Sequence, residues 1–117
     1  MISIRTDEFL NASSEIVYKK LLEGAIKNEN VWMYGLRGIG KTTALIRFAK
    51  EFGYCVIVRN SIIANYLRDE FMYDYIYGEK DQIRGIGKAL VFDEGVNYKK
   101  LKSEGNNIVT GFVLDIE

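Results

Sequence analysis

The hydrophobic and polar positions along the chain follow two periods, one typical of helices and one of buried strands. Apolar residues spaced three and four apart predict helices over residues 12–27, 42–52 and 61–71. Short apolar runs bounded by polar residues or glycine predict strands buried on both faces at residues 31–34, 55–58 and 89–92. Because strands and helices alternate, we expect a parallel sheet with helices packed against it.

Further segments complete this order towards the carboxyl terminus. Residues 73–77 alternate with a period of two and predict a short strand that Gly78 ends. Residues 98–103 predict a short helix, and residues 108–116 predict the last strand, with a break at Gly111 left open.

Two segments and one helix face complete the predicted elements. Residues 2–5 fit either an edge strand or a loose end. The polar, glycine-rich residues 78–88 predict a loop with room for one helical turn. The helix over residues 61–71 is expected to turn four apolar side chains inward, namely Ile62, Ile63, Tyr66 and Leu67.

Length and composition indicate one ordinary globular domain. The chain has 117 residues, of which 48% are hydrophobic and 27% charged, which is enough for a single core. The expected fold class is therefore α/β, a three-layer α-β-α domain with a mainly parallel sheet of about five strands. Within the single domain 1–117, residues 1–30 form a helical lead-in and residues 31–117 the core.

The charge balance and the residue inventory exclude several function classes. With 16 basic and 16 acidic residues the net charge is zero, so no global field attracts nucleic acid or an acidic membrane. The tight basic group Lys99, Lys100 and Lys102 is more typical of a solvated helix face. The absence of histidine, together with a single cysteine that we expect to be buried, excludes a zinc site and a Ser-His or Cys-His hydrolase. No apolar run approaches the about 18 residues of a membrane span and no secretory leader is visible, so we expect a cytoplasmic chain.

Residues 35–42, Gly-Leu-Arg-Gly-Ile-Gly-Lys-Thr, match the phosphate-binding pattern G-x-x-x-x-G-K-[ST] at every fixed position. They follow a predicted strand and precede a predicted helix, which is the context that this pattern needs. In such a loop, backbone N–H groups surround phosphates at the positive end of a helix. Lys41 would reach the β- and γ-phosphates, and the Thr42 hydroxyl would ligate Mg²⁺. The expected nucleotide-binding residues are Gly35, Arg37, Gly38, Ile39, Gly40, Lys41, Thr42 and Thr43.

A pair of carboxylates follows the predicted strand 89–92. Asp93 stands at the carboxyl end of that strand, the edge at which open α/β sheets bind ligands, and is the expected second group for Mg²⁺. Glu94 follows directly, where a carboxylate can orient or deprotonate an attacking water. We expect Lys41 and Glu94 to be the catalytic residues, and Thr42 and Asp93 to hold the metal. A polar strand end is the alternative for the pair.

The loop, the Asp93–Glu94 pair and the strand pattern together resemble the P-loop NTPase superfamily over roughly residues 31–114. More narrowly, they resemble its additional-strand branch with a catalytic glutamate, which includes the AAA+ and RecA-like ATPases and the helicases. The sequence of residues 35–43 is similar to that of STAND-type and archaeal AAA-like ATPases. Short cores of this kind also resemble proteins encoded by bacteriophages. The resemblance implies that the last strand is the one inserted between the loop strand and the Asp93 strand. It also implies that Thr110 approximates a polar sensor of the γ-phosphate, with an ordinary β-branched strand residue as the open alternative.

The chain departs from that branch in two ways. Those families continue into a fifth core strand and a helical lid with a second sensor arginine, which the residues up to Glu117 do not supply. No arginine finger is marked either, although Arg59, Arg68 and Arg84 are candidates that also fit surface positions. We therefore expect turnover to need a partner's arginine, and a homo-oligomer stays open.

Residues 84–88, Arg-Gly-Ile-Gly-Lys, are identical in sequence to residues 37–41. Gln82 replaces the first glycine of the pattern and Ala89 replaces its Ser or Thr. A strand, rather than a helix, is predicted to follow. The run is therefore expected to be a loop and not a second phosphate site.

These observations predict Mg²⁺-dependent binding and hydrolysis of ATP, coupled to a nucleic acid or protein partner. ATP is favoured over GTP because the chain has no Asn-Lys-x-Asp guanine-reading motif. A nucleoside or nucleotide kinase, which would resemble the type II thymidine kinases, is one alternative. A weakly hydrolysing regulatory module is another. The aromatic residues between 66 and 77 fit strand packing better than a stacking platform for bases, since few basic residues surround them.

Overall fold

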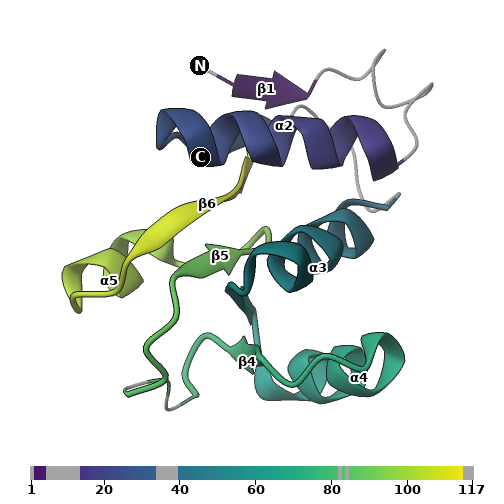
Figure 1. The fold of residues 1–117 in the computed structure, drawn as a ribbon. Helices are drawn as coiled ribbons and strands as arrows, with labels where there is room; N and C mark the ends of the chain where they lie inside the picture. The colour runs from purple at the N-terminus through teal and green to yellow at the C-terminus, as the bar shows by residue number, and fades with distance from the viewer. Residues whose placement is uncertain (1, 5–13, 34–39, 82, 84, 115–117) are drawn as a thin grey trace.

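Within the described part of the chain, six parallel strands form the central sheet, in the order β1-β2-β6-β5-β3-β4 (Figure 1). The computed structural model describes residues 2–4, 14–33, 40–81, 83 and 85–114. The strands are β1 (Ile2–Ile4), β2 (Val31–Met33), β3 (Cys55–Val58), β4 (Ile76–Gly78), β5 (Leu90–Phe92) and β6 (Ile108–Leu114). The five strands that the hydrophobic pattern predicts are all present, but β4 begins at Ile76 rather than at residue 73 and includes Gly78. The amino-terminal segment adds the sixth strand at an edge.

Three helices cover one face of the sheet and one covers the other (Figure 1). The first face carries α2 (Ser14–Lys27), α3 (Lys41–Phe52) and α4 (Ser61–Phe71), and the second carries α5 (Tyr98–Ser103). The protein is therefore a three-layer α/β domain, as predicted. Among the described residues, no helix has the length and apolar character needed to cross a membrane.

Both faces of the strands are buried, which explains their nearly continuous apolar sequence. In β3, Val56 and Val58 belong to the core under α2, α3 and α4, whereas Cys55 and Ile57 belong to the core under α5. The Cys55 thiol is buried, and this burial raises its pKa to about 12. Cys55 is thus an inert core residue.

Strand β6 lies between β2 and β5, where the resemblance places the inserted strand. It runs unbroken through Gly111, so the break at that residue does not occur. The irregularity lies two residues earlier, because Leu90 pairs with Ile108 but Val91 pairs with Thr110. This bulge leaves Val109 as the extra residue.

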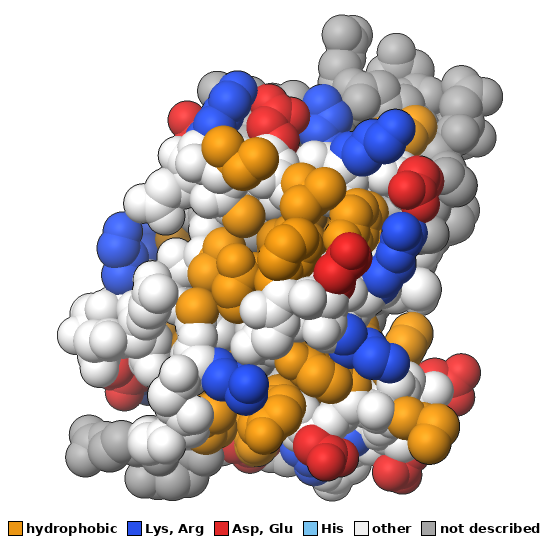
Figure 2. Space-filling model, in the orientation of Figure 1, with side chains coloured by type: hydrophobic (Ala, Val, Ile, Leu, Met, Phe, Trp, Pro, Cys, Tyr) orange, Lys and Arg blue, Asp and Glu red, His pale blue; other side chains and the backbone are white. Residues whose placement is uncertain are grey.

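The inward face of α4 differs from the prediction. Ala64 and Leu67 are its buried residues, whereas Ile62 and Tyr66 are 81% and 66% exposed. Leu67 and Ile63 pack on the first core as predicted, but Ile62 and Tyr66 do not. The prediction missed the small Ala64, which is fully buried, and so placed the apolar stripe too far round the helix. Figure 2 shows hydrophobic side chains grouped on the face that α2, α3 and α4 form, among scattered charged ones.

The aromatic residues before and within β4 do not form one platform. Tyr73 packs on the first core and donates its hydroxyl hydrogen to the Tyr54 carbonyl, whereas Tyr77 packs on the second core. The expectation of strand packing is confirmed for Tyr73 and Tyr77, whereas Tyr66 and Tyr75 are exposed. The described part of the loop after β4 contains no helical turn, and β5 follows the second glycine-rich run directly, as predicted.

The contact between Gly111 and Phe92 gives a test of the packing next to β5. A Cβ at Gly111 would lie 2.3–2.4 Å from three ring atoms of Phe92, which is itself fully buried. We expect Gly111→Ala to lower the free energy of unfolding by about 1–3 kcal/mol in urea denaturation, because the buried ring has no room to move. Adding Phe92→Leu should recover part of the loss, and an unchanged Gly111→Ala variant would contradict this packing.

Candidate active site

The strand order brings the start of α3 and the residues after β5 to the same carboxyl edge of the sheet. After β2 the chain enters α3 on the first face, and after β5 it enters α5 on the second face. Open α/β sheets bind ligands where successive connections leave in opposite directions in this way. The start of α3 and the end of β5 are therefore the place to look for a ligand site.

The start of α3 is built to face an anion. Gly40 precedes the helix with φ +72° and ψ 1°, a left-handed conformation that favours glycine. Its carbonyl accepts the first helical hydrogen bond, from the Ala44 N–H at 2.9 Å. The first turn carries no acidic residue and no side-chain cap. Among the described residues, the positive end of this helix of 12 residues thus has no acidic or capping side chain in its first turn, and such an end favours a negatively charged group.

Asp93 and Thr42 are in contact at this edge of the sheet. The Asp93 N–H donates to the Ile57 carbonyl at 2.9 Å, which continues the sheet one residue beyond β5 and fixes the carboxylate at its edge. The Thr42 hydroxyl donates to Asp93 Oδ2 at 2.8 Å, although 51 residues separate the two. The two predicted metal ligands are thus adjacent.

The Asp93 carboxylate lies in a poorly solvated environment. It is 9% exposed, and this burial raises its pKa above the usual value for aspartate. The Glu94 N–H, which donates to Oδ1 at 2.8 Å, the Thr42 hydroxyl and the Lys41 charge act in the opposite direction. A bound cation would relieve the cost of this buried charge.

Lys41 is buried at the same place. Its side chain is 3% exposed, and its Nζ atom forms an ion pair with Glu94 Oε1. The contact lacks hydrogen-bond geometry, and Nζ has no hydrogen-bond partner among the described residues. An ammonium group with three donors is thus held out of water by one carboxylate oxygen. Such a group needs further acceptors, and a phosphate would provide them.

Of the predicted site residues, Lys41, Thr42, Asp93 and Glu94 come together, and Gly40 begins the helix that carries two of them. The Thr43 side chain is exposed and lines a hollow with Arg47 and Phe71, on the outer side of α3. Gly35, Arg37, Gly38 and Ile39 lie outside the described residues, so their predicted roles stay predictions.

Thr110 does not take part in the site. Its hydroxyl donates to the Glu29 carbonyl at 2.8 Å and packs against Gly24, at the end of α2. Thr110 also pairs with Val91, in the middle of β5, rather than with the residues at the carboxyl edge. Of the two roles left open for Thr110, the contacts fit the ordinary strand residue, because Thr110 is buried and joins α2 to β6.

Of the arginine candidates, Arg68 forms hydrogen bonds within the protein, and Arg84 lies outside the described residues. The Arg68 guanidinium donates to the Ile76 carbonyl and to Asn65 Oδ1. Arg59 follows β3 and so lies at the same sheet edge as Asp93. This proximity follows from the pairing of β3 with β5 and could not be predicted from the sequence alone.

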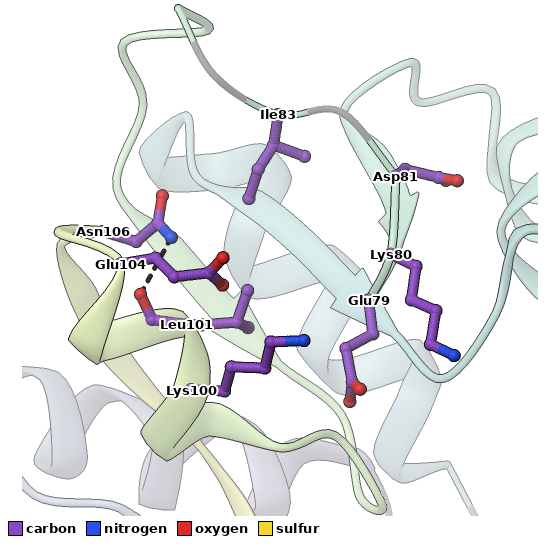
Figure 3. A pocket seen from close by; sticks show the side chains of 8 residues that line it. All are labelled: Glu79, Lys80, Asp81, Ile83, Lys100, Leu101, Glu104 and Asn106. Carbon is purple, nitrogen blue, oxygen red and sulfur yellow. Dashed lines mark hydrogen bonds between the residues drawn. The ribbon is translucent and has the colours of Figure 1, made fainter.

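A second hollow lies on the α5 side of the sheet (Figure 3). Its volume is about 310 Å³ and its walls come from the loop after β4 and from α5. Three of the polar side chains that line it have partners within the protein. Glu79 accepts from the Asn97 N–H, Asp81 from Ser61 and Gly78, and the Asn106 amide donates to the Leu101 carbonyl. None of the predicted site residues lines this hollow.

The donors present suit a magnesium ion better than a metal with an all-protein cage. No group of three or more His, Cys, Asp or Glu side chains gathers within the part of the chain that the structure describes. Thr42 and Asp93 supply two oxygen ligands, and Mg²⁺ commonly completes its shell with water and substrate phosphates. The residues thus fit this ion when it arrives with a nucleotide.

Comparison of the chain with protein-family models, with curated proteins and with solved structures finds no match. The site therefore rests on its own residues and geometry.

The ion pair predicts that two charge-removing variants differ in how much stability they lose. Lys41→Met removes a buried ammonium that lacks hydrogen bonds, so we expect the free energy of unfolding to fall by less than about 1 kcal/mol or to rise. Glu94→Gln leaves that ammonium buried without compensation, and we expect a loss of about 1–3 kcal/mol. Urea denaturation of both variants measures the contrast. A larger loss for Lys41→Met would mean that the lysine serves the fold.

Proposed function

We propose that this protein binds ATP together with Mg²⁺ and hydrolyses the terminal phosphate. The observation that carries the proposal is the buried Lys41 ammonium at the amino end of α3, which has one ion pair and no hydrogen bond among the described residues. A buried cation of this kind stabilises a fold poorly, but it suits a site that must receive phosphate. The adjacent Thr42–Asp93 pair supports the metal part of the proposal.

Each side chain has a distinct role in the proposed reaction. Lys41 exchanges its contact with Glu94 for the phosphate oxygens, and Thr42 and Asp93 hold the metal. When bound, Mg²⁺ would neutralise charge on the phosphates. Glu94, once released by Lys41, orients a water molecule and accepts its proton. The water oxygen bonds to the terminal phosphorus as the bond to the bridging oxygen breaks, which yields ADP and inorganic phosphate.

The zero net charge leaves the identity of a partner open between a protein and a nucleic acid. We propose that turnover is coupled to such a partner. An ATPase assay with and without single-stranded DNA, read beside the oligomeric state, tests this coupling. Transfer of the phosphoryl group to an added nucleoside, instead of to water, would favour a kinase.

Binding is tested by thermal unfolding with and without Mg²⁺ and ATP. At a ligand concentration about a hundred times Kd, binding stabilises by about 2.7 kcal/mol, which corresponds to a rise in Tm of roughly 10 °C for a domain of this size. We expect the rise in the wild type and its loss in Lys41→Met, because the variant lacks the phosphate-binding charge. Lys19→Met, which changes an exposed lysine on α2, is the matched control. An equal rise in Lys41→Met would contradict the assignment.

Hydrolysis is tested with Glu94→Gln, which keeps the size of the side chain and removes the base. We expect nucleotide binding to persist and the steady-state rate of phosphate release to fall by about tenfold or more, as for loss of a general base. Glu70→Gln, an exposed change on α4, controls for the loss of one negative charge. Full activity in Glu94→Gln would place the base elsewhere.

A further inference from the structure

Arg59 lies at the carboxyl edge of the sheet beside the proposed site. It directly follows β3, whose residue Ile57 pairs with Phe92 of β5. The Ile57 carbonyl also accepts the hydrogen bond from the Asp93 N–H. The segment that carries Asp93 and Glu94 therefore leaves the sheet next to the segment that carries Arg59.

The stem of Arg59 passes over Gly95. A Cβ at Gly95 would lie 2.6 Å from Arg59 Cδ, 3.1 Å from Cγ and 3.7 Å from Nε. Gly95 also has a φ of +82°, a conformation that L side chains rarely adopt. Gly95 thus leaves room for the arginine stem immediately after Glu94.

The Arg59 guanidinium is not used by the fold. Three arginines lie within the described residues, and two of them have internal partners. Arg47 pairs with Glu15 and lies over the Tyr18 ring, and Arg68 donates to Asn65 and to a strand carbonyl. Arg59 is exposed and has no ion pair or hydrogen bond among the described residues.

The charges at the site leave a role for this group. Lys41 is the one cation among the four clustered side chains, and Asp93 and Glu94 are two anions. A triphosphate brings several more negative charges, and Mg²⁺ neutralises only part of them. A guanidinium presents N–H donors in a planar fork that matches two phosphate oxygens, and it stays charged at any physiological pH.

Building on the proposed ATPase, we infer that Arg59 binds the terminal phosphate from within the same chain. Lys41 lies at the start of α3 and Arg59 at the end of β3, so the two cations reach the site from different elements. In this arrangement Arg59 distinguishes a triphosphate from a diphosphate, whereas Lys41 holds both.

The test compares the binding of two ligands, a non-hydrolysable β,γ-imido analogue of ATP and ADP, each with Mg²⁺. We expect Arg59→Ala to weaken binding of the analogue by about tenfold to a hundredfold, as for loss of a charged hydrogen-bond pair, and binding of ADP by less than about twofold. Arg59→Lys should restore part of the loss. Lys41→Met should weaken both ligands, and Lys99→Met, which changes an exposed lysine near Gly95, should weaken neither.

A second variant moves the arginine without removing its charge. Gly95→Ala places a methyl group against the Arg59 stem, and we expect the same selective loss of the triphosphate analogue. Gly53→Ala is the matched control, since Gly53 has a φ of +74° but no atom within 4 Å of a built Cβ. The Tm without nucleotide reports the backbone strain that both variants share.

The outcomes separate this inference from the proposed function. Unchanged binding of both ligands in Arg59→Ala, or an equal loss for both, would overturn the role of Arg59 and leave the ATPase proposal standing. A selective loss in Lys99→Met instead would assign the phosphate contact to that lysine. A wild type that binds neither ligand would contradict the proposed function and this inference together.

Discussion

The ion pair between Lys41 and Glu94 is the interaction on which the candidate site depends. It holds an ammonium group out of water at the start of α3, and it ties that helix to the residue after β5. Buried ion pairs usually add little to stability, because removing two charges from water offsets their attraction. The neighbouring Thr42–Asp93 hydrogen bond likewise compensates a buried charge only in part, since a neutral hydroxyl is the partner of a buried carboxylate. Both contacts join groups that a nucleotide and its metal would separate.

The strand order is what makes these contacts possible. β6 lies between β2 and β5, so the helix after β2 and the turn after β5 face each other across one intervening strand. Gly111 lets β6 pass close beneath the Phe92 ring, immediately before Asp93. A side chain in place of Gly111 would displace the Phe92 ring and, with it, the Asp93 carboxylate relative to α3. The site therefore depends on a packing contact on the opposite side of the sheet from α3.

Much of this arrangement could be predicted from residue patterns, because strands buried on both faces and amphipathic helices leave a clear periodicity. The Gly-Lys-Thr and Asp-Glu segments could be predicted as neighbours, since both follow parallel strands. The orientation of α4 could not, because its buried stripe centres on Ala64, and flanking Ile62 and Tyr66 carry a stronger apolar signal although they are exposed. The choice between the two roles of Thr110 could not be made from the sequence, because a strand residue's distance from the sheet edge depends on register, and here a bulge at Val109 shifts that register. The proposed role of Arg59 could not be predicted either, because only the pairing of β3 with β5 shows that Arg59 lies at the same sheet edge as Asp93.

The pairing of Lys41 with Glu94 has a consequence for the proposed ATPase as a binding equilibrium. Glu94 is an intramolecular competitor for the group that phosphate needs, so the apparent affinity is the intrinsic affinity reduced by the free energy of the pair. The same competition helps the products to leave, because the carboxylate recaptures the ammonium as phosphate departs. One glutamate would then set how tightly the nucleotide is held as well as how fast it is cleaved.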